Sequence, residues 1–277
     1  MKIWVRRGLF IGAALALAGV AGLGTLWWAG NRQLTFDHGA LPEPVAGGPG
    51  DAAHGGRLVK VYGCAGCHGE ALTGEDFFGI PAPNLRRRAG QWSMEDFARA
   101  VRRGIRPDGT SISWAMPSEH FAVMADNEVS AIYAHLKTLP QAHDTATESW
   151  KVRLRKPVMA AMGELPPNAL LVRASDANPA VAPRPAAAEW GPYFTRLACG
   201  ECHNHGLGGY PGDTPALADV IQRYDWPAFA RFTTTGITAE GQTVRMMSGV
   251  SRGRLVHMTD AERRALFDYL KSLPQPY

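Results

Sequence analysis

All four cysteines of this 277-residue chain lie in two copies of one short motif. Cys64-Ala-Gly-Cys67-His68 recurs 135 residues later as Cys199-Gly-Glu-Cys202-His203. Two cysteines three positions apart on a helix or turn face the same side, and the histidine that follows lies beside them. This pair of motifs constrains the fold more than any other feature, because the chain has to build the same five-residue site twice.

A C-x-x-C pair followed directly by histidine is the attachment signature of c-type haem. The two cysteines can bond to the vinyl groups along one edge of haem, and the histidine reaches the iron as its proximal ligand. A redox disulfide would be expected on a βαβ unit, and a zinc site of four cysteines would leave both histidines unexplained. We therefore expect two covalently attached haem c groups, with attachment through Cys64, Cys67, Cys199 and Cys202 and proximal ligands His68 and His203.

The segments 51–143 and 186–277 are predicted to be copies of one unit. Besides the motif, His-Leu-Lys-Thr-Leu-Pro ending at Pro140 recurs as Tyr-Leu-Lys-Ser-Leu-Pro ending at Pro274, an offset of 134. Agreement at both ends indicates duplication. Apolar residues at helical spacing precede each motif and fill the last helix of each copy, with almost no strand alternation. We expect an all-α fold with two small domains in tandem.

The other segments of the chain differ from the repeats in composition. Residues 1–30 carry Lys2, Arg6 and Arg7 before an uncharged stretch that is long enough to cross a bilayer, so a retained transmembrane helix is favoured and a cleaved signal is the alternative. Either form places the rest of the chain on the periplasmic side of the cell inner membrane. Residues 31–50 are predicted to be a flexible tether, and 144–185 a proline-containing linker with some packed segments.

The charge of +4 lies outside the predicted domains. Segment 51–143 has as many basic as acidic residues, and so does segment 186–277. Because each domain is neutral overall, nucleic acid is not an expected partner.

Both repeats, though neither the anchor nor the linker, resemble the class I cytochrome c family. In that family a sixth iron ligand, usually methionine, lies in a loop before the C-terminal helix. The resemblance implies Met116 as this ligand in the first repeat, where Trp114-Ala-Met116-Pro117 precedes the helix expected near Asp126.

The second repeat has no Met-Pro sequence, so its distal ligand follows less directly. Gly104 lies 12 residues before Met116, and the same count from Gly236 reaches Ser248, beside Met247 and Met246. Met247 is the expected ligand. Met246, Met258 and His257 remain alternatives, since thioether and imidazole both bind haem iron.

The family also has a P-x-L element whose proline carbonyl accepts the Nδ1–H of the proximal histidine and whose leucine covers the haem. Such hydrogen bonds fix the orientation of the ligand ring. The family further crosses its first and last helices at a small residue against an aromatic one. The resemblance implies these roles for Pro83, Leu85, Pro215 and Leu217, and for the pairs Gly56 with Tyr133 and Gly191 with Phe267.

The predicted ligands favour an electron carrier over an enzyme, because histidine and methionine fill both axial positions of the iron. We expect the chain to carry single electrons on the periplasmic side, between a dehydrogenase or bc-type complex and an oxidase or soluble cytochrome. One alternative is a dihaem redox enzyme, either peroxidase-like or thiosulfate-oxidising. Another is a tightly bound cytochrome subunit of a larger dehydrogenase or oxidase complex.

Overall fold

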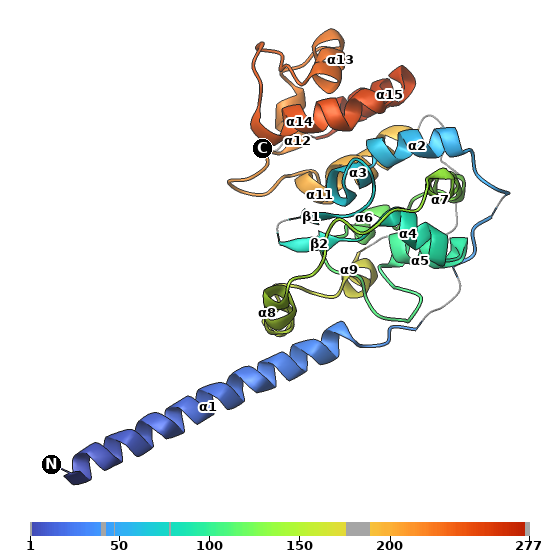
Figure 1. The fold of residues 1–277 in the computed structure, drawn as a ribbon. Coiled ribbons are helices and arrows are strands. Elements are labelled where there is room, and N and C mark those ends of the chain that lie inside the picture. Colours follow the sequence, from blue (N-terminus) through green and yellow to red (C-terminus); the bar gives the residue numbers. More distant parts are fainter. Residues whose placement is uncertain (1, 40–42, 47, 78, 176–188, 275–277) are drawn as a thin grey trace.

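The computed structural model describes residues 2–39, 43–46, 48–77, 79–175 and 189–274, and within them the chain is mostly helical (Figure 1). A long N-terminal helix leads into a first group of helices around one motif, and a second group surrounds the other. The elements up to the end of the first group are α1 (Lys2–Leu34), α2 (Ala52–Val61), α3 (Cys64–His68), β1 (Glu75–Phe77), β2 (Ile80–Ala82), α4 (Leu85–Gln91), α5 (Met94–Arg103), α6 (Ser118–Phe121) and α7 (Asp126–Thr138).

The remaining elements form the linker and the second group. The linker helices are α8 (Trp150–Ala161) and α9 (Asn168–Ala174). The second group consists of α10 (Trp190–Phe194), the π-helical turn η2 (Thr195–Cys199), α11 (Gly200–His203), α12 (Leu217–Ile221), α13 (Trp226–Thr235), α14 (Arg245–Gly253), the 3₁₀ turn η3 (Leu255–His257) and α15 (Asp260–Ser272). The two all-α domains predicted from the sequence are therefore present, with one short hairpin that the sequence did not indicate.

That hairpin pairs β1 with β2 in antiparallel register, with Phe77 opposite Ile80. Each strand has three residues, which is too short for alternation to be visible in the sequence. The hairpin forms one wall of the cavity described below.

The first and last helices of each domain cross at a glycine. In the first domain α2 crosses α7, and a Cβ on Gly55 would overlap the carbonyl oxygen of Ala131. The predicted pair of Gly56 and Tyr133 is wrong, because Gly56 faces His135 and the Tyr133 hydroxyl donates to the Trp92 carbonyl.

In the second domain α10 crosses α15. A Cβ on Gly191 would overlap Tyr269 and the Ala265 carbonyl, so the predicted glycine is at the crossing but Phe267 is not its partner. Phe267 packs instead on Trp226 and Phe229.

The two domains contact each other through equivalent glutamates. Glu128 and Glu262 occupy matching positions of α7 and α15, since 262 − 128 = 134. The Glu128 carboxylate accepts a hydrogen bond from Tyr193 of the second domain, and Glu262 accepts two from Arg57 of the first, at 2.7 and 2.9 Å. Both carboxylates are buried. The duplicated units thus pack reciprocally, as the two copies in an isologous dimer do.

The N-terminal helix continues to Leu34 and packs against the linker helix α8. Its Gly30 packs against the backbone of Pro157 in α8. Among the described residues, α1 is the one helix that is long and apolar enough to cross a membrane, over the 26 residues Leu9–Leu34.

The structure differs from the flexible tether predicted for residues 31–50. Asp37 bridges to Thr110, and the His38 amide donates to the Gly109 carbonyl at 2.9 Å. Further along, the buried Glu43 forms an ion pair with Arg103. The physical reason is that these polar groups find partners in the first domain, which proline and glycine content does not reveal.

Candidate haem sites

A glycine in the left-handed backbone conformation turns the chain from α2 into the first motif. Gly63 has φ of 76° and separates α2 from α3, a conformation that costs other residues about 1 kcal/mol or more. The second motif lacks this glycine, because Ala198 stands at the equivalent position, and the chain runs through the π-helical turn η2 into α11 instead. The two motifs thus have the same sequence pattern and different helical approaches.

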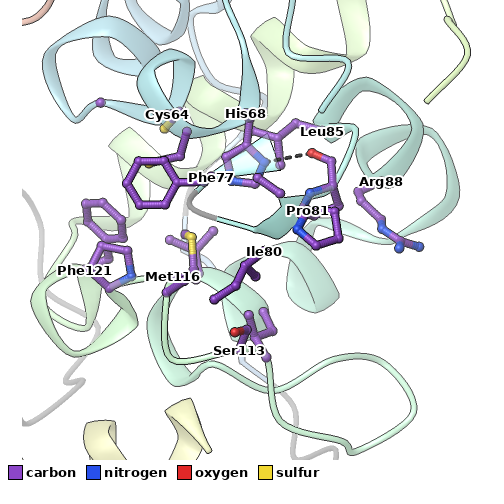
Figure 2. A pocket seen from close by; sticks show the side chains of 18 of the residues that line it. Cys64, His68, Phe77, Ile80, Pro81, Leu85, Arg88, Ser113, Met116 and Phe121 are labelled. Atoms are coloured by element: carbon purple, nitrogen blue, oxygen red, sulfur yellow. Dashed lines mark hydrogen bonds between the residues drawn. The ribbon is translucent and has the colours of Figure 1, made fainter. Parts of the chain in front are cut away.

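Both motif histidines are held by the predicted proline carbonyls. His68 Nδ1–H donates to the Pro83 carbonyl at 2.7 Å (dashed in Figure 2), and His203 Nδ1–H donates to the Pro215 carbonyl at 2.9 Å. Burial lowers the pKa of both imidazoles, although these hydrogen bonds oppose the shift. Each ring is therefore neutral at pH 7 and keeps Nε2 available as a ligand atom.

The first motif opens onto an apolar cavity of about 290 Å³. Figure 2 shows His68 and Met116 pointing into it from opposite sides, with Phe77 and Ile80 beside them. The lining also includes Cys64, Cys67, Pro83 and Leu85, so the structure brings all six predicted residues of the first site together. Cations on the lining, Arg88, Arg106 and Lys156, suit the two propionates of a haem.

The loop that carries Met116 is held by a residue of the linker. The buried Asn168 side chain, at the start of α9, donates to the Ser113 carbonyl at 3.2 Å and to the Met116 carbonyl. Its backbone amide donates to the Ile112 carbonyl at 3.2 Å. Sequence reasoning missed Asn168, and no signal in the sequence connects a linker asparagine to carbonyls 52 and 55 residues earlier.

In the second domain the structure differs from the ligand loop that the family resemblance implies around Met247. Met247 lies in α14 and is partly buried against the core, whereas Met246 is 67% exposed. The Ser248 hydroxyl fixes this helix by donating to the Gly236 carbonyl at 2.6 Å and accepting from the Val244 amide at 2.8 Å. The alternative ligand Met258 is buried in the hydrophobic core.

The environment of the cysteines disfavours the alternatives to haem. Burial raises the pKa of Cys64 and of Cys199 to about 12, so both thiols are protonated at neutral pH. All four cysteines are free, and among the described residues no three His, Cys, Asp or Glu side chains gather as a metal site would require. A shared zinc site is not formed, and two separate attachment motifs in two helical domains define the class of c-type cytochromes.

Comparison with known proteins gives the same class. Residues 50–136 match the family described as cytochrome c oxidase, cbb3-type, subunit III, and residues 192–274 match the family cytochrome c. A diheme cytochrome c-type protein of Cereibacter sphaeroides is 27% identical over 98% of this chain and 99% of its own length. The chain is a dihaem c-type cytochrome with two haem c groups, and it carries electrons.

Other relatives are subunits of larger assemblies. The fructose dehydrogenase cytochrome subunit of Gluconobacter japonicus is 24% identical over 84% of this chain. The cytochrome c subunit of the alcohol dehydrogenase (quinone) of Gluconobacter oxydans is 28% identical over 79% of it. The chain spans 54% of the length of each of these two relatives, in contrast to its match over the whole diheme cytochrome.

Proposed function

We propose that the chain accepts single electrons from a dehydrogenase on the periplasmic face of the inner membrane and passes them to an oxidase or another cytochrome. The observation that carries this proposal is the pair of motif histidines, each buried and each held through Nδ1 by a proline carbonyl. Such an arrangement presents a neutral nitrogen in a fixed orientation at both sites. The names of the dehydrogenase subunits among its relatives support a dehydrogenase as donor.

The proposed attachment residues are Cys64 and Cys67 in the first site and Cys199 and Cys202 in the second. His68 with Met116, and His203 with Met247, are the proposed axial ligands. Leu85 and Leu217 follow the two proline carbonyls and would cover the haem faces. When bound, each haem supplies a one-electron ferric/ferrous couple, and the protein exchanges electrons without binding a substrate at the iron.

The chain's own residues keep the first site closed to reactants. Asn168 holds the Met116 loop through two backbone carbonyls, and the cavity lining around Phe77 and Ile80 is apolar. A fixed methionine opposite the histidine leaves no position for peroxide, so this geometry favours a carrier over a peroxidase-like or thiosulfate-oxidising enzyme.

We further propose that α1 spans the membrane. Residues 51–143 and 186–277 remain the proposed domains. The position of helix α8 supports the proposal that α1 spans the membrane, because α8 contacts α1 near Gly30. In Figure 1 α8 is seen nearly along its axis and α1 from the side, so α8 runs across α1. A helix across the end of a spanning segment lies along the bilayer surface, and α8 has the basic and exposed residues of an interfacial helix, namely Lys151, Arg153, Arg155 and the 68% exposed Trp150.

The test is purification of the full chain from membranes in mild detergent. We expect two haems per chain by pyridine haemochrome, a dehydrogenase that co-purifies, and reduction of both haems when the substrate of that dehydrogenase is added. Carbon monoxide should bind neither reduced haem at an appreciable rate. Rapid carbon monoxide binding together with peroxide turnover would overturn the carrier assignment in favour of an enzyme.

A further inference from the structure

The linker helix that packs on α1 also reaches the cavity at the first motif. Pro157 of α8 lies against α1, because a Cβ on Gly30 would overlap its carbonyl oxygen. The preceding residue, Lys156, is on the cavity lining, together with Glu148 two residues before α8. Since one residue along a helix turns the side-chain direction by about 100°, α8 contacts α1 on one side and the cavity on another.

These two linker residues belong to a group of charges at one end of the cavity. Lys156 Nζ donates to Glu148 at 3.4 Å. Burial lowers the pKa of Arg106, a further residue of the lining; Arg88 lowers it as well and Glu148 raises it, so these charges are close together. Figure 2 shows Arg88 on the side of the cavity away from Cys64. The charged group therefore lies away from this attachment cysteine.

The lining has an excess of positive charge. Glu201 on the lining is in an ion pair with Arg254 at 3.0 Å, so its charge is already balanced. The other charged residues of the lining are Arg88, Arg106, Lys156 and Glu148, with a net charge of 3 − 1 = +2. The two ionised propionates of one haem carry a charge of −2, and they extend from the edge of the ring opposite the vinyl groups. Cations at the end away from the cysteine therefore match the haem in both sign and number.

Arg106 and Lys156 come from different segments, and both have donors for a carboxylate. Arg106 Nη1 donates to the Thr110 hydroxyl at 3.1 Å and to the Ser111 carbonyl. A guanidinium has five N–H donors, so these bonds fix its direction and leave donors for a further acceptor. The Lys156 ammonium has three donors, and its side chain is only 28% exposed, which limits screening of its charge by water.

The second domain does not repeat the two arginines of this group. The bridged loops 105–111 and 237–243 correspond at an offset of 132, and the same offset relates Pro83 to Pro215 in the P-x-L elements. The charged group is therefore a property of the first site, the site that α8 reaches. The uncharged residues that stand at the positions of Arg88 and Arg106 are Val220 and Thr238.

We propose that Lys156 of α8 and Arg106 of the first domain bind the propionates of the first haem, so that this haem links α8, and through it α1, to the first domain. The contacts are ion pairs, and no bond is made or broken beyond the attachment at the cysteines. Helix α8 is then a part of the first haem site as well as a connection between the domains. The inference rests on the proposed attachment and ligation of the first haem.

The experiment compares Lys156→Gln with wild type, as the haem-loaded full chain in detergent. Resonance Raman spectroscopy reports the bending vibration of the propionates, and loss of the ammonium should shift this band for the first haem. Amide hydrogen exchange in α8 should become at least about tenfold faster, because the helix loses its link to the haem. The first haem is identified by its changed potential in a Met116→His background.

A redox titration of the same samples is the third measurement. A cation favours the reduced state of a nearby redox centre, so its loss should lower the potential of the first haem. The electron occupancy of the first haem relative to the second should fall by roughly fivefold, as for one charge about 12 Å from a redox centre in a partly screened site.

Two further variants make the test decisive. Lys151→Gln removes an exposed cation of α8 that is not on the cavity lining, and it should leave all three measurements unchanged. Glu148→Gln removes the carboxylate beside Lys156 and should raise the first potential, which decides the matter if Lys156→Gln does not accumulate with two haems. An unchanged propionate band or unchanged exchange in Lys156→Gln, equal effects of Lys156→Gln and Lys151→Gln, or no rise in Glu148→Gln would overturn the proposal. A wild-type chain with fewer than two haems would instead overturn the proposed function.

Discussion

Replacing Arg57 by methionine is expected to loosen the contact between the two domains. Its guanidinium donates to both carboxylate oxygens of Glu262, at 2.7 and 2.9 Å, and Glu262 is 1% exposed. Removing one partner of a buried ion pair costs about 3–5 kcal/mol, because a charge stays behind in a poorly solvated place. Glu262 also accepts from the Thr259 amide at 2.8 Å, so we expect the lower end, about 3 kcal/mol in the free energy of unfolding.

The chain offers a control on α15, the helix that carries Glu262. Arg264 Nε donates to both oxygens of Asp268 at 3.0 Å, but these side chains are 53% and 55% exposed. Exposed pairs contribute about 0–1 kcal/mol, so Arg264→Met is expected to lose at most about 1 kcal/mol. Both substitutions remove an arginine that contacts both oxygens of one carboxylate, and the two carboxylates differ in burial, since Glu262 is 1% exposed and Asp268 is 55% exposed.

The assay is thermal unfolding of the haem-loaded full chain, followed by circular dichroism in the Soret region. For a domain of 60–100 residues, 1 kcal/mol moves the midpoint by about 4–8 °C, so Arg57→Met should melt roughly 12 °C or more below wild type. A double-mutant cycle with Glu262→Gln should give a coupling energy well above about 0.5 kcal/mol. Equal losses in Arg57→Met and Arg264→Met, or additive effects in the cycle, would refute the reasoning from burial.

Four further outcomes are expected. Met116→His should keep a low-spin first haem at a lower potential, since imidazole replaces thioether, and an unchanged titration would show that another residue is the ligand. Asn168→Ala should reduce stability by about 1–3 kcal/mol in chemical denaturation, because two carbonyls lose their donor. The lowered pKa of His120, about 4, means that the unfolded chain binds more protons between pH 6.5 and 4; stability should therefore fall as the pH drops through that window, and a pH series of melting midpoints should be flatter in His120→Gln. In proteoliposomes, brominated lipids should quench the fluorescence of Trp150, measured as the difference from Trp150→Phe, and no difference would place α8 away from the bilayer.

The features that the sequence predicted well are those with local spacing. The two motifs and the P-x-L elements each occupy a few consecutive residues, and the structure places the His68 and His203 hydrogen bonds as expected. Such interactions depend on short-range geometry, which a residue pattern specifies directly. The duplication then doubled the evidence, because each local feature occurred twice in the same order.

The features that were missed depend on contacts between distant segments. Asn168 supports the Met116 loop from the linker, and Glu43 pairs with Arg103 across 60 residues. The glycine at the crossing of α2 and α7 was predicted one residue too late, as Gly56 instead of Gly55. One residue along a helix turns the side-chain direction by about 100°, and sequence spacing alone does not define which residue faces the other helix. Met247 was expected in a loop because the family places its methionine ligand in one, yet the Ser248 hydroxyl donates to the Gly236 carbonyl and fixes a helix there.

The close joining of α1 to the first domain has a consequence for how partners are met. A domain on a flexible linker can take many positions above the bilayer, and its rate of contact with a partner protein depends on an effective concentration that the linker length sets. Here α1 ends at Leu34, and Asp37 and Glu43 directly after it contact the first domain. These contacts hold the first domain at a fixed distance from the end of α1. With α1 in the bilayer, the distance of the first domain from the membrane surface is fixed, so the domain cannot move along the membrane normal to reach a partner. It transfers electrons only to a neighbour whose own redox centre lies at the same level, which suits a long-lived assembly better than brief collisions.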